Sequence, residues 1–259
     1  MRSPRIDDPR ILTLAVAALA SLITWIALAA AVSEMDMGME MGTGMTVSNA
    51  EPGHWTAAVV TTSGMWLLMM LAMMLPVVAP MLAAYADIAR NDPARSAWSL
   101  RVTAFAAGYG LLWGAFAVTA ALLQLALRDS PLLRMGGTLA APTTAAALLV
   151  VAGIYQWLPL KEACLRHCRS PMAFLLAHWR PGVGGAFRLG ARHGWFCLGC
   201  CIALMGLMFV FGTMAFWGMA VLAAYCVAER LVPAAERWGR WVGAMLVAAG
   251  IAVAARGAP

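Results

Sequence analysis

The chain has 259 residues, of which 63% are hydrophobic and only 12% are charged. Soluble domains carry roughly 25% charged residues, so the composition excludes a soluble enzyme and a disordered chain. The formal net charge is +6, and the chain contains 19 methionines and 6 cysteines. Sulfur is a soft metal ligand, and its placement along the chain is therefore the feature to follow.

Six stretches without Asp, Glu, Lys or Arg mark the predicted membrane-spanning helices. A helix needs roughly 17–25 residues to cross a bilayer. The second stretch is long enough for an outer turn and one long helix, and the fifth is divided into two helices by a predicted turn at Gly212-Thr213. We therefore predict an all-α, polytopic transmembrane helix bundle with about seven spans, from the stretches 11–32, 52–86, 102–127, 135–160, 193–228 and 241–255.

The basic residues predict the orientation of this bundle. If the N-terminus is cytoplasmic, 15 of the 18 Lys and Arg residues fall on inner segments, as the positive-inside rule requires. The basic charge is then a topology signal, so we expect membrane lipid and no nucleic acid as a partner. We interpret the first span as an uncleaved anchor, because its 22 apolar residues exceed the roughly 7–15 of a signal-peptide core.

The predicted organisation is a single transmembrane domain, residues 1–259, with two notable loops. The outer loop 33–55 is acidic and rich in methionine. The inner loop 159–192 is basic, contains a cysteine pair, and has prolines and glycines that disfavour one straight helix. Its first part, Lys161 to Cys168, is expected to form a short helix at the membrane interface.

The first sulfur group lies in the outer loop. Met35, Met37, Met39 and Met41 alternate with acidic residues and glycine, and His54 precedes the second span. Thioethers select Cu(I), carboxylates raise the local cation concentration, and an imidazole adds a ligand. The pattern indicates copper capture on the oxidising side of the membrane, although a flexible loop in which methionine is incidental stays open.

The second sulfur group lies in the second predicted span. Met70, Met73 and Met74 share one helical face with Trp66, by the spacing i, i+4, i+7 and i+8. Pro76 removes a backbone hydrogen bond and predicts a kink that exposes carbonyl groups. These methionines are candidate metal ligands, but methionine also fills irregular gaps between helices, so ordinary packing is the alternative.

The third sulfur group consists of five cysteines near the inner side. The i, i+4 spacing places the members of each pair on one face, and the cytosol keeps thiols reduced. A thiolate metal site is therefore favoured, while small hydrophobic packing residues and a redox-active Cys-x-x-Cys pair stay open. The candidates are Cys164, Cys168, Cys197, Cys200 and Cys201.

Other chemistries find little support in the sequence. A proton-coupled pump would need a carboxylate or histidine in the middle of a span, and none is apparent. The chain shows no phosphate-binding loop and no Ser-His-Asp set, and it lacks the large cytosolic domains of an ATP-driven pump. We therefore assign no catalytic residues and do not expect an enzyme.

Three motifs resemble a bacterial family of predicted metal-binding integral membrane proteins of unknown function. They are the Trp- and Met-rich run Trp66–Pro76, the block from Tyr155 to Pro171 with its Lys and two Cys, and Gly194-x-x-Cys-x-Gly-Cys-Cys ending at Cys201. The resemblance covers residues 55–232. It departs in the next helix, where Met214-Ala215 and Trp217-Gly218 replace the family's Met-Asn and Trp-Met.

The resemblance implies a role in copper handling, because the family includes a membrane copper chaperone for a bacterial tyrosinase. Our leading hypothesis is a multi-pass protein of the bacterial inner membrane. It binds Cu(I) through Met and Cys and delivers it to a copper enzyme, to a periplasmic copper carrier or across the membrane. The alternatives are a membrane thiol-disulfide oxidoreductase and a structural subunit of a larger membrane complex.

Overall fold

The computed structural model describes residues 8–40, 54–92, 97–128, 130, 139, 141–212, 215–232 and 235–256, and only the backbone of 35–40, 54 and 235–237. Over these residues the structure has ten helices and no strand, which confirms the all-α class. The helices are α1 (Pro9–Glu40), α2 (His54–Asn91), α3 (Trp98–Leu127), α4 (Pro142–Tyr155), α5 (Pro159–Arg169), α6 (Pro171–His178), α7 (Gly182–Gly206), α8 (Met208–Phe211), α9 (Phe216–Leu231) and α10 (Ala235–Arg256).

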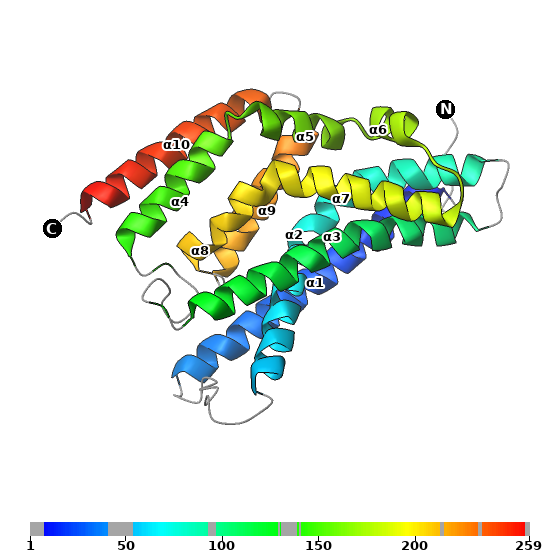
Figure 1. Ribbon diagram of the computed structural model, residues 1–259. Helices are drawn as coiled ribbons and strands as arrows, with labels where there is room; N and C mark the ends of the chain where they lie inside the picture. Colours follow the sequence, from blue (N-terminus) through cyan, green and yellow to red (C-terminus); the bar gives the residue numbers. More distant parts are fainter. Residues whose placement is uncertain are drawn as a thin grey trace.

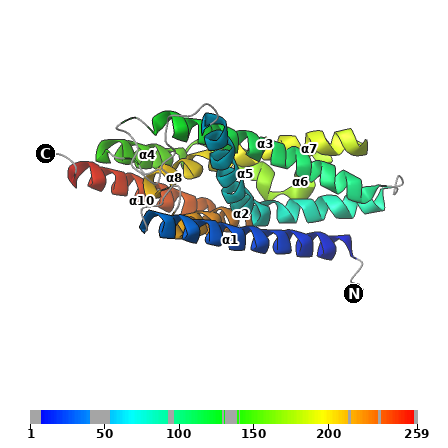
Figure 2. The ribbon, with the colours of Figure 1, turned by 90° about the horizontal axis from the view of Figure 1, so that it is seen from below.

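Four long helices form the body of the molecule. They pack in the order α1, α2, α3 and α7, while α4 and α10 form a separate pair (Figure 1). The shorter α9 joins these parts through contacts with α2, α5, α7 and α10. In α2, 61% of the most apolar window is buried, against 17% in α1 and α10, so α2 is the central helix. It changes direction along its length (Figure 2), as expected for a helix that contains Pro76 and Pro80.

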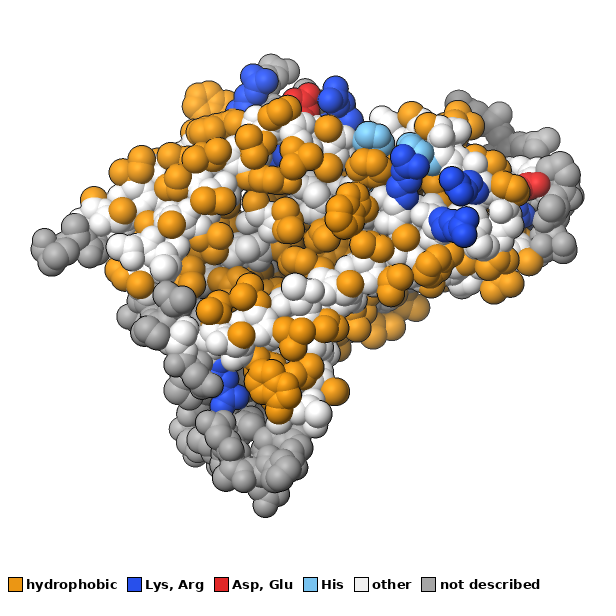
Figure 3. All heavy atoms as spheres, in the orientation of Figure 1, with side chains coloured by type: hydrophobic (Ala, Val, Ile, Leu, Met, Phe, Trp, Pro, Cys, Tyr) orange, Lys and Arg blue, Asp and Glu red, His pale blue; other side chains and the backbone are white. Residues whose placement is uncertain are grey.

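Among the described residues, five helices are long and apolar enough to cross a membrane. A sixth is added if α4 and α5, which meet at 62°, form one broken span. Apolar side chains cover much of the face seen in Figure 3, and basic side chains gather toward its edges. An apolar exterior of this kind fits contact with lipid rather than with water.

The count of seven spans is not confirmed. The predicted break within the fifth stretch is present, since α8 ends at Phe211 and Gly212 has a φ of 99° that favours glycine. The next helix, α9, has 16 residues and falls just short of the roughly 17–25 that a span needs. The cytoplasmic position of the N-terminus stays a prediction.

Two segments that we predicted as loops contain helix. The inner segment 159–192 holds α5, α6 and the first turns of α7, and the short helix expected over Lys161 to Cys168 corresponds to α5. Pro159 and Pro171 begin α5 and α6, at a position where a missing N–H costs nothing. The predicted outer loop 33–55 also contains helix, because α1 continues to Glu40.

Two glycines bring α3 and α7 close together. A Cβ atom at Gly190 would lie 1.9 Å from the Phe105 carbonyl oxygen, and one at Gly108 would lie 2.1 Å from the Phe187 carbonyl oxygen. Any larger residue would force the two backbones apart. This contact therefore fixes the position of α7 against α3, two turns before its first cysteine.

Candidate metal centre

The two cysteine groups that the sequence places about thirty residues apart meet between α5 and α7. The side chains of Cys168 and Cys200 lie close enough to interact with each other. Cys164 lies one turn earlier on α5, and a Cβ atom on Gly199 would approach its Sγ to 2.8 Å. Because Gly199 has no side chain, the sulfur of Cys164 can pack directly against α7.

A third helix adds the sixth cysteine. The side chain of Cys226 in α9 lies close enough to that of Cys201 to interact with it. Within α7, the thiols of Cys200 and Cys201 both point back to the Cys197 carbonyl oxygen, at 3.0 and 2.8 Å. We call this set the cysteine cluster: Cys164, Cys168, Cys197, Cys200, Cys201 and Cys226. All six are free thiols, and each is at most 8% exposed.

Two polar side chains contact the sulfurs of the cysteine cluster. The Tyr109 hydroxyl of α3 lies 3.1 Å from Cys197 Sγ. Arg230, at the end of α9, donates from Nη2 to the sulfurs of both Cys197 and Cys200, at 3.1 Å each. A buried polar group needs such partners to offset the loss of water. The cysteine cluster therefore brings polar side chains into contact with sulfurs that also belong to the apolar core.

A buried histidine lies one turn before the cluster on α7. His193 is 1% exposed, and its ring stacks on Tyr109 with centroids 5.7 Å apart. Its Nδ1 atom has no hydrogen-bond partner within the described structure. The predicted stretch 193–228 has this residue at its edge, whereas α7 begins at Gly182 and leaves it inside the helix. A buried, unpaired ring nitrogen makes it an additional candidate ligand.

The cluster is compact, but it is not a preformed cage. Among the described residues, no three His, Cys, Asp or Glu side chains have the arrangement needed to hold a metal ion together. Cu(I) has a strong preference for soft sulfur and is satisfied by two sulfur ligands. The neighbouring cysteine pairs of the cluster are thus closer to the requirement of Cu(I) than to the four-ligand requirement of a structural zinc site.

The candidate methionines of α2 lie in the core. Met70 and Met73 are fully buried and Met74 is 1% exposed, in the same apolar cluster as the cysteines. Their helix packs mainly on α1 and α3, with further contacts to α9. Met70, Met73 and Met74 are therefore carried by a different wall of the bundle from Cys164 and Cys168.

A contact between aromatic rings relates the positions of the two sulfur groups. The Trp66 ring of α2 lies 5.5 Å from the Phe209 ring of α8. Met74 comes eight residues after Trp66, and Cys201 comes eight residues before Phe209, in helices that run in opposite directions (Figure 1). The methionine face of α2 and the cysteines of α7 therefore lie on the same side of this ring contact.

The predicted outer group lies largely beyond what the structure describes. Met35, Met37 and Met39 belong to the last turns of α1 by their backbone, but their side chains lie outside the described part of the chain. Met41 lies outside it altogether, and His54 begins α2 with its backbone alone described. A metal role for these five residues stays a prediction.

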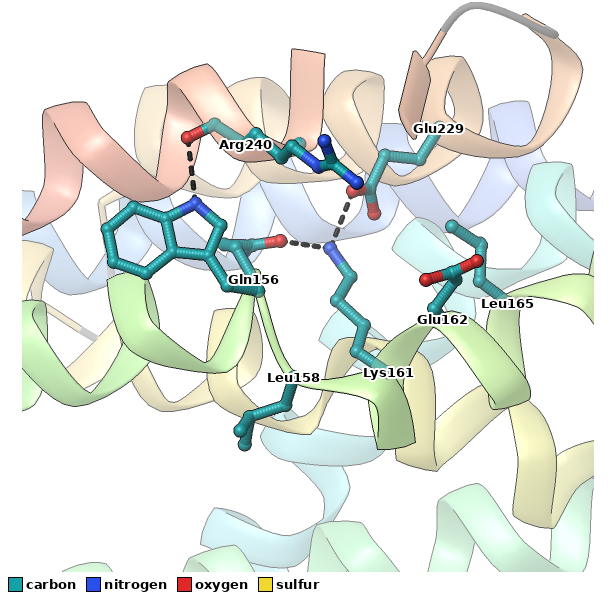
Figure 4. Close-up of a pocket in the computed structure, with 9 residues that line it drawn as sticks. Gln156, Leu158, Lys161, Glu162, Leu165, Glu229 and Arg240 are labelled. Atoms are coloured by element: carbon teal, nitrogen blue, oxygen red, sulfur yellow. Dashed lines mark hydrogen bonds and ion pairs between the residues drawn. The ribbon is translucent and has the colours of Figure 1, made fainter. Parts of the chain in front are cut away.

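A buried ion pair connects α5 to α9 close to the cluster (Figure 4). Lys161 Nζ lies 2.5 Å from Glu229 Oε1, the side chains are only 3% and 5% exposed, and Lys161 also donates to Gln156 Oε1. Tyr225 donates to the same Glu229 oxygen at 2.6 Å. The pair lines a cavity of about 330 Å³, which is also bordered by Trp157, Glu162, Gly239 and Arg240.

This ion pair positions the cysteines. Lys161 is one turn from Cys164 on α5, and Glu229 directly precedes Arg230 on α9. Arg169 adds a second tie, because its Nε donates to the Glu229 carbonyl oxygen at 2.7 Å. The two ends of α5 are therefore anchored to α9 by charged side chains, with Cys164 and Cys168 between them.

Our sequence reading missed four residues of this site: Tyr109, His193, Cys226 and Arg230. Cys226 had a detectable signal, since it is the sixth cysteine and lies one turn before a basic residue. Arg230 looked like an ordinary basic residue at the end of a span. The contact of Tyr109 with Cys197 depends on the packing of α3 against α7, for which the sequence offers no spacing rule.

The fold and the site together define a class: a helical protein with apolar outer faces suited to a membrane and a buried cluster of cysteine thiols. The family model for PpoB2, described as a copper chaperone, matches residues 63–253. The match covers well over half of the chain, and the chain belongs to this family. The predicted family resemblance is confirmed, and a copper-handling role is supported. Searches of the curated proteins and of the solved structures find no match.

Proposed function

We propose that the chain binds Cu(I) in the cysteine cluster and passes it to an acceptor protein. The observation that carries this proposal is the convergence of cysteines from α5, α7 and α9 in one buried site. Soft thiolates suit Cu(I), and the family is one of copper chaperones. A chaperone carries its metal unchanged, so no chemical transformation is assigned to the chain.

The methionines of α2 extend this proposal into a route for the ion. Met70, Met73 and Met74 are buried, as Cys201 is, but on another helix. Thioethers are neutral and bind Cu(I) more weakly than thiolates do, and an ion that must leave needs successive sites of moderate strength. We propose a relay in which these methionines exchange the ion with the cysteine cluster.

The outer part of the route remains the one predicted from sequence. Met35, Met37, Met39, Met41 and His54 would collect or release copper at the periplasmic face of a bacterial inner membrane. The acceptor would be a copper enzyme or a periplasmic copper carrier. The copper chaperone description of the family supports such a partner, and the apolar helices support a membrane location.

Metal analysis of the purified full-length chain tests the proposal. Under anaerobic, reducing conditions in lipid nanodiscs, we expect wild type to retain Cu(I) in competition with a chromophoric chelator. The Cys197→Ser/Cys200→Ser variant should lose most of it. Met245→Leu removes a sulfur from the exposed side of α10 (62% exposed) and serves as the control with wild-type copper. A wild type that retains no Cu(I) would overturn the proposal.

Both rival functions predict different results. A thiol oxidoreductase needs a nucleophile that a partner disulfide can reach, and Cys197 and Cys200 are 0% and 2% exposed. It would yield a trapped mixed disulfide in cells instead of metal-protected thiols. A purely structural subunit would show unchanged metal content in Cys200→Ser and in Met73→Leu.

A further inference from the structure

Arg230 places a positive charge in direct contact with the sulfurs of two buried cysteines. One nitrogen of its guanidinium is shared between Cys197 and Cys200, at 3.1 Å from each sulfur. A guanidinium stays protonated in proteins. The neighbouring acid, Glu229, is turned away toward Lys161 and Tyr225. The charge of Arg230 is therefore directed at the thiol pair.

We propose that Arg230 makes this pair selective for a monovalent metal ion. The inference rests on the proposed Cu(I) binding and adds its charge specificity. When an ion binds to Cys197 and Cys200, two thiol protons leave and two negative charges remain on sulfur. With Arg230 and a monovalent ion, the two positive charges balance the two negative ones. With a divalent ion, the same group carries a surplus positive charge.

The surroundings make this balance matter. Cys197 and Cys200 are buried, and an uncompensated charge in such a place is costly. Without Arg230, a two-thiolate site with a monovalent ion would carry one negative charge, whereas a divalent ion would neutralise it. Arg230 reverses that preference, and so acts as a specificity-determining residue that does not itself bind the metal.

The placement of Arg230 follows from α9. Cys226 lies one turn earlier on the same helix and contacts Cys201, so one face of α9 carries both a sulfur and the counter-charge. Arg169 and Lys161 hold the end of this helix through Glu229. Because α9 is anchored in this way, the guanidinium of Arg230 keeps a fixed position beside the cysteine sulfurs. A fixed position is needed for a charge that determines which ion binds.

The test compares Cu(I) and Zn(II) affinities of full-length variants in nanodiscs, measured anaerobically by chelator competition. Arg230→Gln should lower the ratio of Cu(I) to Zn(II) affinity by at least about tenfold, whereas Arg230→Lys, which keeps the charge, should stay near wild type. Arg240→Gln removes an exposed charge beside the Lys161 cavity and is the matched control. Arg230→Met, of similar length, repeats the prediction if Arg230→Gln does not fold.

The possible outcomes distinguish failure of the proposed charge selectivity from failure of the proposed Cu(I) binding. If Arg230→Gln weakens both metals equally, the arginine is a structural anchor and the inference fails while Cu(I) binding stands. An unchanged ratio in a folded neutral variant has the same meaning. If wild type binds no Cu(I), both the inference and the proposed function fail.

Discussion

The cysteine cluster and the methionine face of α2 are equally buried, yet they differ in what surrounds the sulfur. Both Cys197 and Met73 belong to the apolar core cluster, but Cys197 also lies within 3.1 Å of a tyrosine hydroxyl and a guanidinium. Burial alone therefore does not distinguish a site from packing. The polar partners do, because a folded chain has no reason to place a charge in an apolar core unless something balances it.

The largest effect on stability should come from removing the ion pair between Lys161 and Glu229, which anchors α5 to α9. Lys161→Met leaves Glu229 buried and unpaired, which should cost about 3–5 kcal/mol and loosen the α5 side of the cluster while α2 is unaffected. Thermal unfolding and the rate of thiol alkylation measure both effects. The exposed pair Arg10–Asp87 supplies a control: Arg10→Met should cost less than about 1 kcal/mol.

A double variant checks the cause of that loss. Lys161→Met combined with Glu229→Gln removes both charges and should recover much of the stability, because the buried unpaired carboxylate is gone. If the double variant is less stable than Lys161→Met alone, the ion pair is not the element that anchors α5.

The next largest effect should be on copper itself. Cys200→Ser replaces a soft thiolate with a hard hydroxyl at the junction of α5 and α7, and should lower Cu(I) affinity by about 100-fold. Chelator competition measures the affinity, and size-exclusion chromatography confirms that the variant is folded. If this variant binds Cu(I) with wild-type affinity, the cysteine cluster is not the principal copper site.

A smaller effect is expected from filling the space beside Cys164. Gly199→Ala places a Cβ atom 2.8 Å from Cys164 Sγ, which must then move, at a cost of about 1–3 kcal/mol. The melting temperature should fall, and Cys164 should react faster with alkylating reagents. Gly184→Ala, in open space on the same helix, should instead be neutral or stabilise by up to about 1 kcal/mol.

The smallest effect should be that of Met73→Leu, which tests whether the methionine face of α2 takes part in copper transfer. A Met-to-Leu exchange in a core usually costs less than about 1.5 kcal/mol, so the fold should persist. In the relay that we propose, the variant keeps the copper of the cysteine cluster but transfers it to a chelating acceptor more slowly than wild type. Unchanged transfer would leave Met73 with a packing role only.

The parts of the fold that rest on local pattern were predictable. The absence of charge over long stretches indicated helices, and Gly212 marked the break before α9. The i, i+4 spacing correctly placed Cys197 and Cys201 on one turn. These features depend on residues near one another in sequence, where helix geometry fixes the relation.

The remaining features depend on contacts between distant segments. Because Arg188 and Arg192 carry charge, the predicted stretch started only at residue 193. The helix α7 instead begins at Gly182, since basic residues are tolerated in the turns near the end of a membrane helix. The meeting of Cys168 with Cys200, and the arrival of Arg230 between two sulfurs, require the docking of α5 and α9 on α7. No spacing in a single sequence encodes that docking.

The depth at which the thiols are buried bears on the timing of metal exchange. With every cysteine at most 8% exposed, an ion reaches sulfur only after a local opening, for which the junction of α5 with α4, bent by 62°, is a natural hinge. Residence time then depends on how often α5 lifts and not only on affinity. Displacement of α5 would then release a bound ion, which would stay shielded from its surroundings until that opening.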